Sequence, residues 1–454
     1  MNEPDTMTES TCRNCNTPEL KRRDFLRVGS LSLFGIGMGQ FLAVQRALAA
    51  AGIGDATDRA KAQSCILLWL QGGPSHVDLW DPKANSNFRP ISTNVDGIRI
   101  SELLPRVAKH MDKLAVIRSM HTEEIDHPEA IHYAMTGHRQ NPAMQFPALG
   151  SILSRELGER AGIPPYVIAP QIDLKLYQDH FGAQFIGAEY EPFIAPDPSA
   201  EDFQLPDLSL PKSVSVERVE QRRAFRDLIE KAYRQKREIA EFGKMDIFTA
   251  KALEMILSDA VKDAFDLSQE TEKTRERYGK HGIGQSALLA RRLVEAGSRF
   301  VTAAGYRGVN PWDSHAQNDS EHRDKLAPPL DQALSTLLED LQERGLLEST
   351  VVIAMGEFGR TPHINPDNGR DHWPHCWSMV IGGGGLRGGQ VIGASDERGA
   401  YVAERMVTMG DLFATIYKAM GIDWEKTYMT PIGRPIKLAN SIDDKTGAPL
   451  EELV

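Results

Sequence analysis

The sequence predicts an α/β protein whose central sheet is mainly parallel and carries helices on both faces. Two observations predict it. Short apolar runs recur along the chain, and segments with a helical spacing of apolar residues separate them. The first run, residues 65–70, is apolar throughout and stops at Gly72 and Gly73, as expected of a strand that is buried on both faces of a parallel sheet.

The same kind of run predicts further strands along the chain, at residues 114–117, 166–169, 300–302, 350–354 and 379–381. Two helices are predicted between them. Residues 287–295 place apolar side chains on one face and end at Gly297. Leucines at three- and four-residue spacing over residues 330–341 oppose a stripe of acidic residues, which is the pattern of an amphipathic helix.

The segment at about 213–278 differs from this alternation, because it is charged, helical in pattern and poor in β-branched runs. It predicts a helical insertion in one α/β domain of residues 50–454. The insertion could cap a pocket or form an interface, and its periodicity fits both roles.

Residues 1–49 are predicted to be a twin-arginine signal peptide. Arg22 and Arg23 precede a Phe-Leu pair, a glycine-interrupted apolar stretch follows at 28–44, and Ala47-Leu48-Ala49 offers a cleavage site. The stretch is too short and weak for a stable membrane span. We therefore expect export by the twin-arginine translocon to the periplasm or the medium.

Composition excludes some partners. The formal net charge of −11 makes nucleic acid and anionic membranes poor ligands. Cys12 and Cys15 fall within the predicted leader, and we expect Cys65 and Cys376 to be buried free thiols, because nothing in their spacing demands a disulfide.

Polar side chains follow several predicted strands at the point where each strand ends, which is where open parallel sheets bind ligands. These side chains are His76 and Asp78, Asp313 and His315, Glu357 and Arg360, and, one loop later, Asp371 and His372. A single Asp-x-His more often makes a loop hydrogen bond than a metal bond. The coincidence of four clusters predicts a divalent metal site, for zinc, manganese or calcium.

Four stretches carry a resemblance to known proteins, at residues 70–78 (LQGGPSHVD), 310–315 (NPWDSH), 355–361 (MGEFGRT) and 369–373 (GRDHW). Their order resembles the alkaline phosphatase-like superfamily of phosphatases, sulfatases and phosphomutases. In particular it resembles a family of twin-arginine-exported bacterial proteins of unknown function that are often labelled sulfatases. The stretches span nearly the whole mature chain.

The superfamily resemblance implies two metal ions that bridge a phosphate or sulfate, and a Ser, Thr or modified Cys as nucleophile. By position, Asp313 and His315 resemble one Asp/His metal pair, and His372 with Asp371 resembles a later imidazole ligand. Glu357 falls where the superfamily places an Asp. His76 and Asp78 lie near the first-strand carboxylate. Phe358 departs from the pattern, because the superfamily has a His ligand there.

The nucleophile is a second departure. The superfamily commonly places it nine residues before the Thr of a Thr-Gly pair, and counting back from Thr136 lands on His127, with no Ser, Thr or Cys adjacent. His127 is then a metal ligand or a nucleophile, or water attacks, or no attack occurs. Thr122 and Ser75 are further candidates for the nucleophile. Arg360 and Arg370 could clamp an anion, and pairing with a neighbouring carboxylate is an equal expectation.

We therefore expect a metal-dependent, extracytoplasmic hydrolase of phosphate or sulfate esters, with a small anionic or a sulfated or phosphorylated glycan as substrate. The alternative is a metal-containing protein that binds anionic glycans without turnover, on a degenerate hydrolase fold.

Overall fold

The structure, a computed structural model, describes residues 61–170, 180–205, 258–305 and 310–454. The predicted signal peptide and most of the predicted helical insertion lie outside these residues. The described end of that insertion is helical. No helix in the described ranges combines the length and apolar character that a membrane crossing needs.

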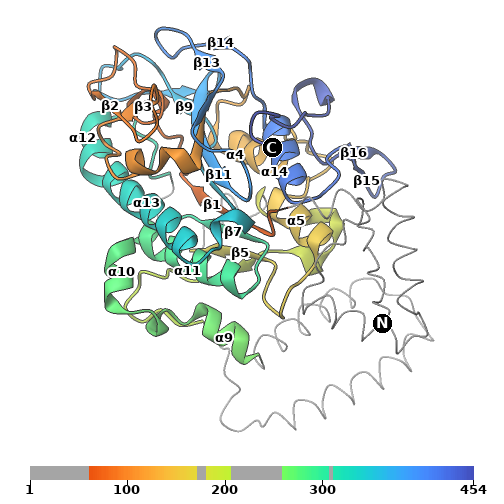
Figure 1. Cartoon of the computed structure of the whole chain (residues 1–454). Coiled ribbons are helices and arrows are strands. Elements are labelled where there is room, and N and C mark those ends of the chain that lie inside the picture. Colours follow the sequence, from red (N-terminus) through yellow and green to blue (C-terminus); the bar gives the residue numbers. More distant parts are fainter. Residues whose placement is uncertain (1–60, 171–179, 206–257, 306–309) are drawn as a thin grey trace, which may run out of the picture. The chain divides into compact units, whose positions relative to one another are not determined.

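The core of the protein is an eight-stranded sheet in the order β12-β4-β11-β8-β1-β7-β5-β6 (Figure 1). Its strands are β1 (Ser64–Trp69), β4 (Leu114–Met120), β5 (Tyr166–Ala169), β6 (Phe193–Ile194), β7 (Phe300–Ala303), β8 (Thr350–Met355), β11 (Trp377–Gly383) and β12 (Gln390–Ile392). β1 lies between β7 and β8 and is parallel to both. β11 is antiparallel to its neighbours β4 and β8.

All the apolar runs predicted to be strands are strands of this sheet, but the parallel direction expected for residues 379–381 is wrong. A parallel neighbour of β8 would need a crossover back to the start of β8, usually a helix. The chain from β8 to β11 instead holds only the short strands β9 (Gly359–Arg360) and β10 (His372–Trp373), so β11 runs back antiparallel.

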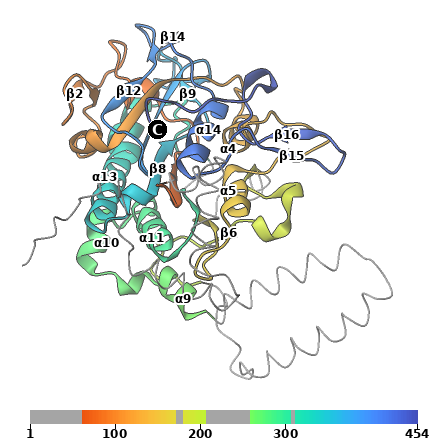
Figure 2. The same ribbon diagram turned by 45° about the vertical axis from the view of Figure 1, so that its right-hand side comes forward.

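Helices cover both faces of the sheet, as predicted (Figures 1 and 2). Successive residues of β1 point to opposite faces, so Leu67 and Trp69 join one buried apolar cluster and Ile66 and Leu68 join another. The first face carries α4 (His127–Thr136), α5 (Leu149–Leu157) and α14 (Met409–Ala419). The second carries η3 (Val107–Lys113), α9 (Asp259–Phe265), α10 (Glu272–Tyr278), α11 (Gly282–Ala296) and α13 (Ala327–Glu343).

The remaining elements are short. The strands are β2 (Pro90–Ser92), β3 (Arg99–Ser101), β13 (Ala394–Ser395), β14 (Val402–Glu404), β15 (Thr427–Met429) and β16 (Pro435–Lys437). The helical turns are η2 (His76–Asp78), η5 (Gln184–Ile186), η6 (Ala188–Tyr190), η7 (Leu267–Gln269), α12 (Asn318–Ser320), η8 (Glu321–Leu326), η9 (Leu347–Ser349) and η10 (Ile442–Asp444). Cys65 and Cys376 are buried and free, as expected.

Parallel strands end at the same edge of the sheet, and this edge positions the site. The loops that leave β1, β4, β7 and β8 all start there, so residues far apart in sequence meet beyond the strand ends.

Candidate metal centre

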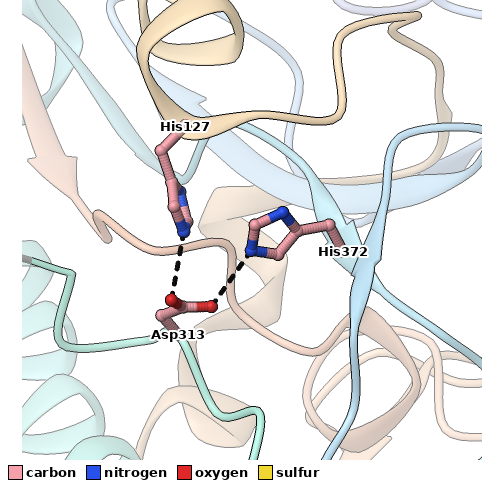
Figure 3. Close-up of side chains that lie close together, drawn as sticks. All are labelled: His127, Asp313 and His372. Carbon is pink, nitrogen blue, oxygen red and sulfur yellow. Dashed lines mark hydrogen bonds and ion pairs between the residues drawn. The ribbon is translucent and has the colours of Figure 1, made fainter.

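Three side chains from different loops converge beyond this edge of the sheet (Figure 3). His127 begins α4 after β4, Asp313 follows β7, and His372 lies on β10. Nε2 of His127 is 3.2 Å from Oδ2 of Asp313, and Nε2 of His372 is 3.2 Å from Oδ1 of the same carboxylate. One ligand atom from each residue lies within 4.8 Å of the other two.

His315 joins this group from the solvent side. Its Nε2 is 3.0 Å from Oδ1 of Asp313 and 3.0 Å from Nε2 of His372. The His315 side chain is 46% exposed, whereas that of His372 is 16% exposed. The centre is therefore open at His315 and enclosed at His127 and His372.

Each of the three imidazole rings uses Nδ1 for a second contact. Nδ1 of His127 lies 2.7 Å from Oε1 of Glu357, Nδ1 of His315 lies 2.8 Å from Oδ1 of Asp371, and Nδ1 of His372 lies 2.6 Å from the Ile125 carbonyl oxygen. Carboxylate and carbonyl oxygens accept hydrogen bonds, so each Nδ1 carries a proton and each Nε2 turns towards the centre. This is the usual way in which proteins orient metal-binding histidines.

The facing Nε2 atoms of His315 and His372 need something between them. With both Nδ1 protons committed elsewhere, two lone pairs 3.0 Å apart repel unless a proton or a cation lies between them. Ligands bonded to one ion at about 2.0–2.2 Å lie about 3.0–3.5 Å apart. The 3.0–3.2 Å separations around Asp313 match that spacing. Three imidazoles and one carboxylate fit zinc or manganese better than calcium, which prefers oxygen ligands.

The charges of the centre favour an ionised carboxylate. Burial raises the pKa of Asp313, but hydrogen bonds from His127 and His372 and the Arg360 guanidinium outweigh it and hold that pKa well below its usual range. Burial lowers the pKa of His127, but Asp313 and Glu357 outweigh it and raise the value to about 9. Without a metal, His127 is therefore a cation at neutral pH.

Residues 62–448 match the model of a family described as a protein of unknown function (DUF1501). The chain belongs to the DUF1501 family. Membership of a family of unknown function is what the sequence motifs predicted. No curated protein matches the chain.

Solved structures similar to this DUF1501 chain share little sequence with it. The PsFucS1 sulfatase from Pseudoalteromonas sp. is 14% identical, with 83% of this chain and 72% of that chain covered and a TM-score of 0.38. An alkaline phosphatase superfamily protein from Vibrio parahaemolyticus is 13% identical. The match covers 80% of this chain and 67% of that chain, with a TM-score of 0.40. The TAB5 alkaline phosphatase mutant is 13% identical. The match covers 80% of this chain and 99% of that chain, with a TM-score of 0.36. These likenesses concern the fold alone.

Glu357 of the DUF1501 chain is buried and contacts Gly72 and His127. Its two carboxylate oxygens accept the Gly72 backbone N–H at 2.9 and 3.1 Å, in addition to the contact with His127. Gly72 has a φ of +110°, and a Cβ there would lie 2.6 Å from the Asp313 backbone nitrogen. The glycine thus lets the β1 loop approach closely enough to hold Glu357. Glu357 therefore orients His127 and lies outside the group of His127, Asp313 and His372.

Phe358 fills one side of the centre. Its ring is fully buried, and its centroid lies 5.1 Å from that of His127 and 4.6 Å from that of His372. An apolar ring therefore packs against both imidazoles at the position where the resemblance implies a further ligand.

Arg360 is held within the scaffold. Its guanidinium is fully buried and donates to the carbonyls of Gly73 at 2.9 Å and Arg370 at 3.1 Å, to the Gly72 carbonyl, and to Asp313. The expected pairing with a neighbouring carboxylate is what this geometry shows. The guanidinium is positioned to support Asp313.

His76 and Asp78 do not join the centre, although both follow β1 directly. Asp78 is fully buried and accepts bonds from Arg370 at 2.8 Å, from Ser75 at 2.6 Å and from Asn318 at 2.9 Å. Nε2 of His76 contacts the Gly399 carbonyl at 2.7 Å. The turn η2 directs both side chains into the interior, where they hold loops together.

The sequence could not reveal two partners of the centre. The Ile125 carbonyl and the Gly72 N–H are backbone groups, so the residue types at these positions do not indicate what the groups contact.

Proposed function

We propose that this protein is an extracytoplasmic, metal-dependent hydrolase of phosphate or sulfate esters. His127, Asp313 and His372 would hold one divalent ion, and His315 would complete the ligands on the open side. The observation that carries the proposal is the pair of facing Nε2 atoms of His315 and His372, 3.0 Å apart with both Nδ1 atoms engaged elsewhere.

A divalent ion at this position supplies Lewis acidity and lowers the pKa of water. The protein's own part is to fix the rings and the carboxylate. Among the described residues, no Ser, Thr or Cys side chain hydrogen-bonds to His127, Asp313 or His372. Water is therefore the attacking group we propose, and His315 is the imidazole nearest to solvent.

The location and the substrate are part of this proposal. The twin-arginine motif at Arg22 and Arg23 supports export by the translocon to the periplasm or the medium. A sulfated or phosphorylated glycan is the substrate class we propose, since the exposed His315 leaves room for a large ester at the mouth of the centre.

A second candidate function is binding without turnover. The packing of Phe358 against His127 and His372 favours it, because an apolar ring stands where a further ligand would complete a two-ion site. Such a protein would retain one ion and a glycan but release no sulfate or phosphate.

Elemental analysis of the purified protein tests the proposal first, together with turnover of aryl phosphates and aryl sulfates. Asp313→Asn and His372→Gln should lose the metal and all turnover. Asp367→Asn and His363→Gln are matched controls, because both residues are exposed on the nearby loop, and they should keep both properties. Metal-free wild-type protein, even after incubation with zinc and manganese, would refute the metal centre. Bound metal without turnover would favour the binding protein.

A further inference from the structure

A cavity of about 390 Å³ borders the loop that leads to His127, and it has no role in the function proposed above. Its wall comes from the loop before α4, the end of α4, the residues that follow it, and the segment from β16 to η10. It includes Glu123, Glu124, Tyr133 and Gln140. This volume is large enough for a one- or two-ring ligand.

The cavity and the metal centre share one stretch of chain. Glu124 in the wall precedes Ile125, whose carbonyl orients His372. The side-chain amide of Gln140 donates to the Pro128 carbonyl at 3.3 Å, next to His127. A ligand in the cavity therefore lies against Glu123 and Glu124, which lead directly into the segment that positions the centre.

Acidic side chains outnumber basic ones in the wall, where Glu123, Glu124, Asp443 and Asp444 face Arg139, Arg434 and Lys437. Arg139 contacts Glu123, and its Nε lies 3.1 Å from Glu124. Arg434 lies 3.7 Å from Asp444, and Lys437 donates to the Asp444 carbonyl. An anion would meet this excess of acidic side chains, so the wall favours an uncharged ligand that forms hydrogen bonds.

The wall also has apolar and unpaired polar parts. The rings of His138 and Phe146 stack at 4.1 Å with an interplanar angle of 2°. Burial lowers the pKa of His138 to about 4, so its ring is neutral at pH 7. Tyr133 is 5% exposed, and its hydroxyl has no hydrogen-bond partner among the described residues. The hydroxyl is itself covered, and a small movement of the ring that brings it to a ligand is favourable, because a buried hydroxyl without a partner is costly.

We propose that this cavity binds an uncharged sugar ring, the alcohol part of the ester. Many paired polar groups, a stacked apolar wall and an unpartnered hydroxyl suit a neutral ligand that carries several hydroxyl groups. The role as part of an ester substrate rests on the proposed function, whereas the binding of the sugar does not. The charged ester group would lie outside the cavity, towards His372.

Saturation-transfer NMR with uncharged sugars tests the assignment directly. The probes are glucose, galactose, mannose, N-acetylglucosamine, lactose and cellobiose at pH 7. We expect at least one to bind, with about 3- to 10-fold weaker affinity in Tyr133→Phe, the effect of one lost hydrogen bond. Tyr417→Phe is the matched control, because its hydroxyl is also buried without a partner and Tyr417 is not part of the wall.

Two further variants separate this inference from the proposed function. Asn141→Trp places a large ring at the exposed edge of the wall and should abolish sugar binding while metal content stays unchanged. Asp313→Asn should lose the metal and keep sugar binding. The cavity assignment is overturned if none of the sugars binds the wild-type protein, or if Tyr133→Phe and Asn141→Trp both bind like the wild type. Either result leaves the metal centre standing.

Discussion

Nδ1 of His127 lies 2.7 Å from a carboxylate oxygen of Glu357, and this contact decides which nitrogen of the ring faces Asp313. The carboxylate accepts two bonds at once, from His127 and from the Gly72 N–H. It therefore fixes the proton of His127 on Nδ1 and leaves Nε2 for the centre.

Glu357→Gln should weaken metal binding about 10- to 100-fold. The Gly72 N–H needs an acceptor, so the glutamine would give it the amide oxygen and turn its NH2 towards His127. The ring would then carry its proton on Nε2, towards the ion. Competition with a chelator measures the affinity, and Glu348→Gln is the exposed control. Equal affinities in the two variants would show that Glu357 does not set the tautomer.

Metal affinity should rise with pH by about tenfold per unit between pH 7 and about 9. Asp313 and Glu357 raise the pKa of metal-free His127 to about 9, despite its burial. Below that value the ion must displace the Nε2 proton, and above it the ring is already neutral. Calorimetry in two buffers of different ionisation enthalpy should find about one proton released at pH 7. An affinity that stays constant over this range would argue against His127 as a ligand.

The sequence predicted much of this site because the strand-end rule is geometric. Asp313, His315 and His372 follow strands that end at the same edge, and the structure brings them together. The same rule also selected His76 and Asp78, which the turn η2 directs inward. A position after a strand predicts where the backbone leaves the sheet, but it does not predict the direction of the side chain.

The direction of β11 could not be predicted from the sequence for a similar reason. Residues 377–383 are buried throughout, and a buried apolar run has the same composition in either direction. The connection between β8 and β11 decides the direction, and that connection contains no helix in the described structure.

Asp78→Ala should lower the free energy of unfolding by about 3–5 kcal/mol, because it leaves the buried Arg370 guanidinium without its carboxylate. Metal stoichiometry should not change, since Asp78 contacts Arg370, Ser75 and Asn318 and lies outside the centre. Urea unfolding and elemental analysis measure the two effects. The milder Asp78→Asn variant guards against misfolding, and loss of metal from that variant in its folded state would reinstate Asp78 as a ligand.

Arg360→Ala should also cost about 3–5 kcal/mol of stability, because it removes the guanidinium beside Asp313 and leaves several buried carbonyls without a donor. The exposed control Arg398→Ala should change stability by no more than about 0.5 kcal/mol. An arginine that only clamped the substrate's anion would behave differently. Its loss would raise KM and leave urea unfolding unchanged. That outcome would support Arg360 as a residue that binds the anion of the substrate.

Phe358→His should strengthen metal binding by about tenfold, because it places a fourth imidazole beside His127 and His372. The metal-free variant should lose about 1–3 kcal/mol of stability, since a polar ring replaces a fully buried apolar one. Phe358→Leu keeps the site apolar and offers no ligand atom, so its affinity should equal that of the wild type. If the two variants bind metal equally well, the position of Phe358 does not adjoin the ion. If only the histidine variant binds a second ion and gains turnover, Phe358 is the residue that prevents a two-ion site in this chain.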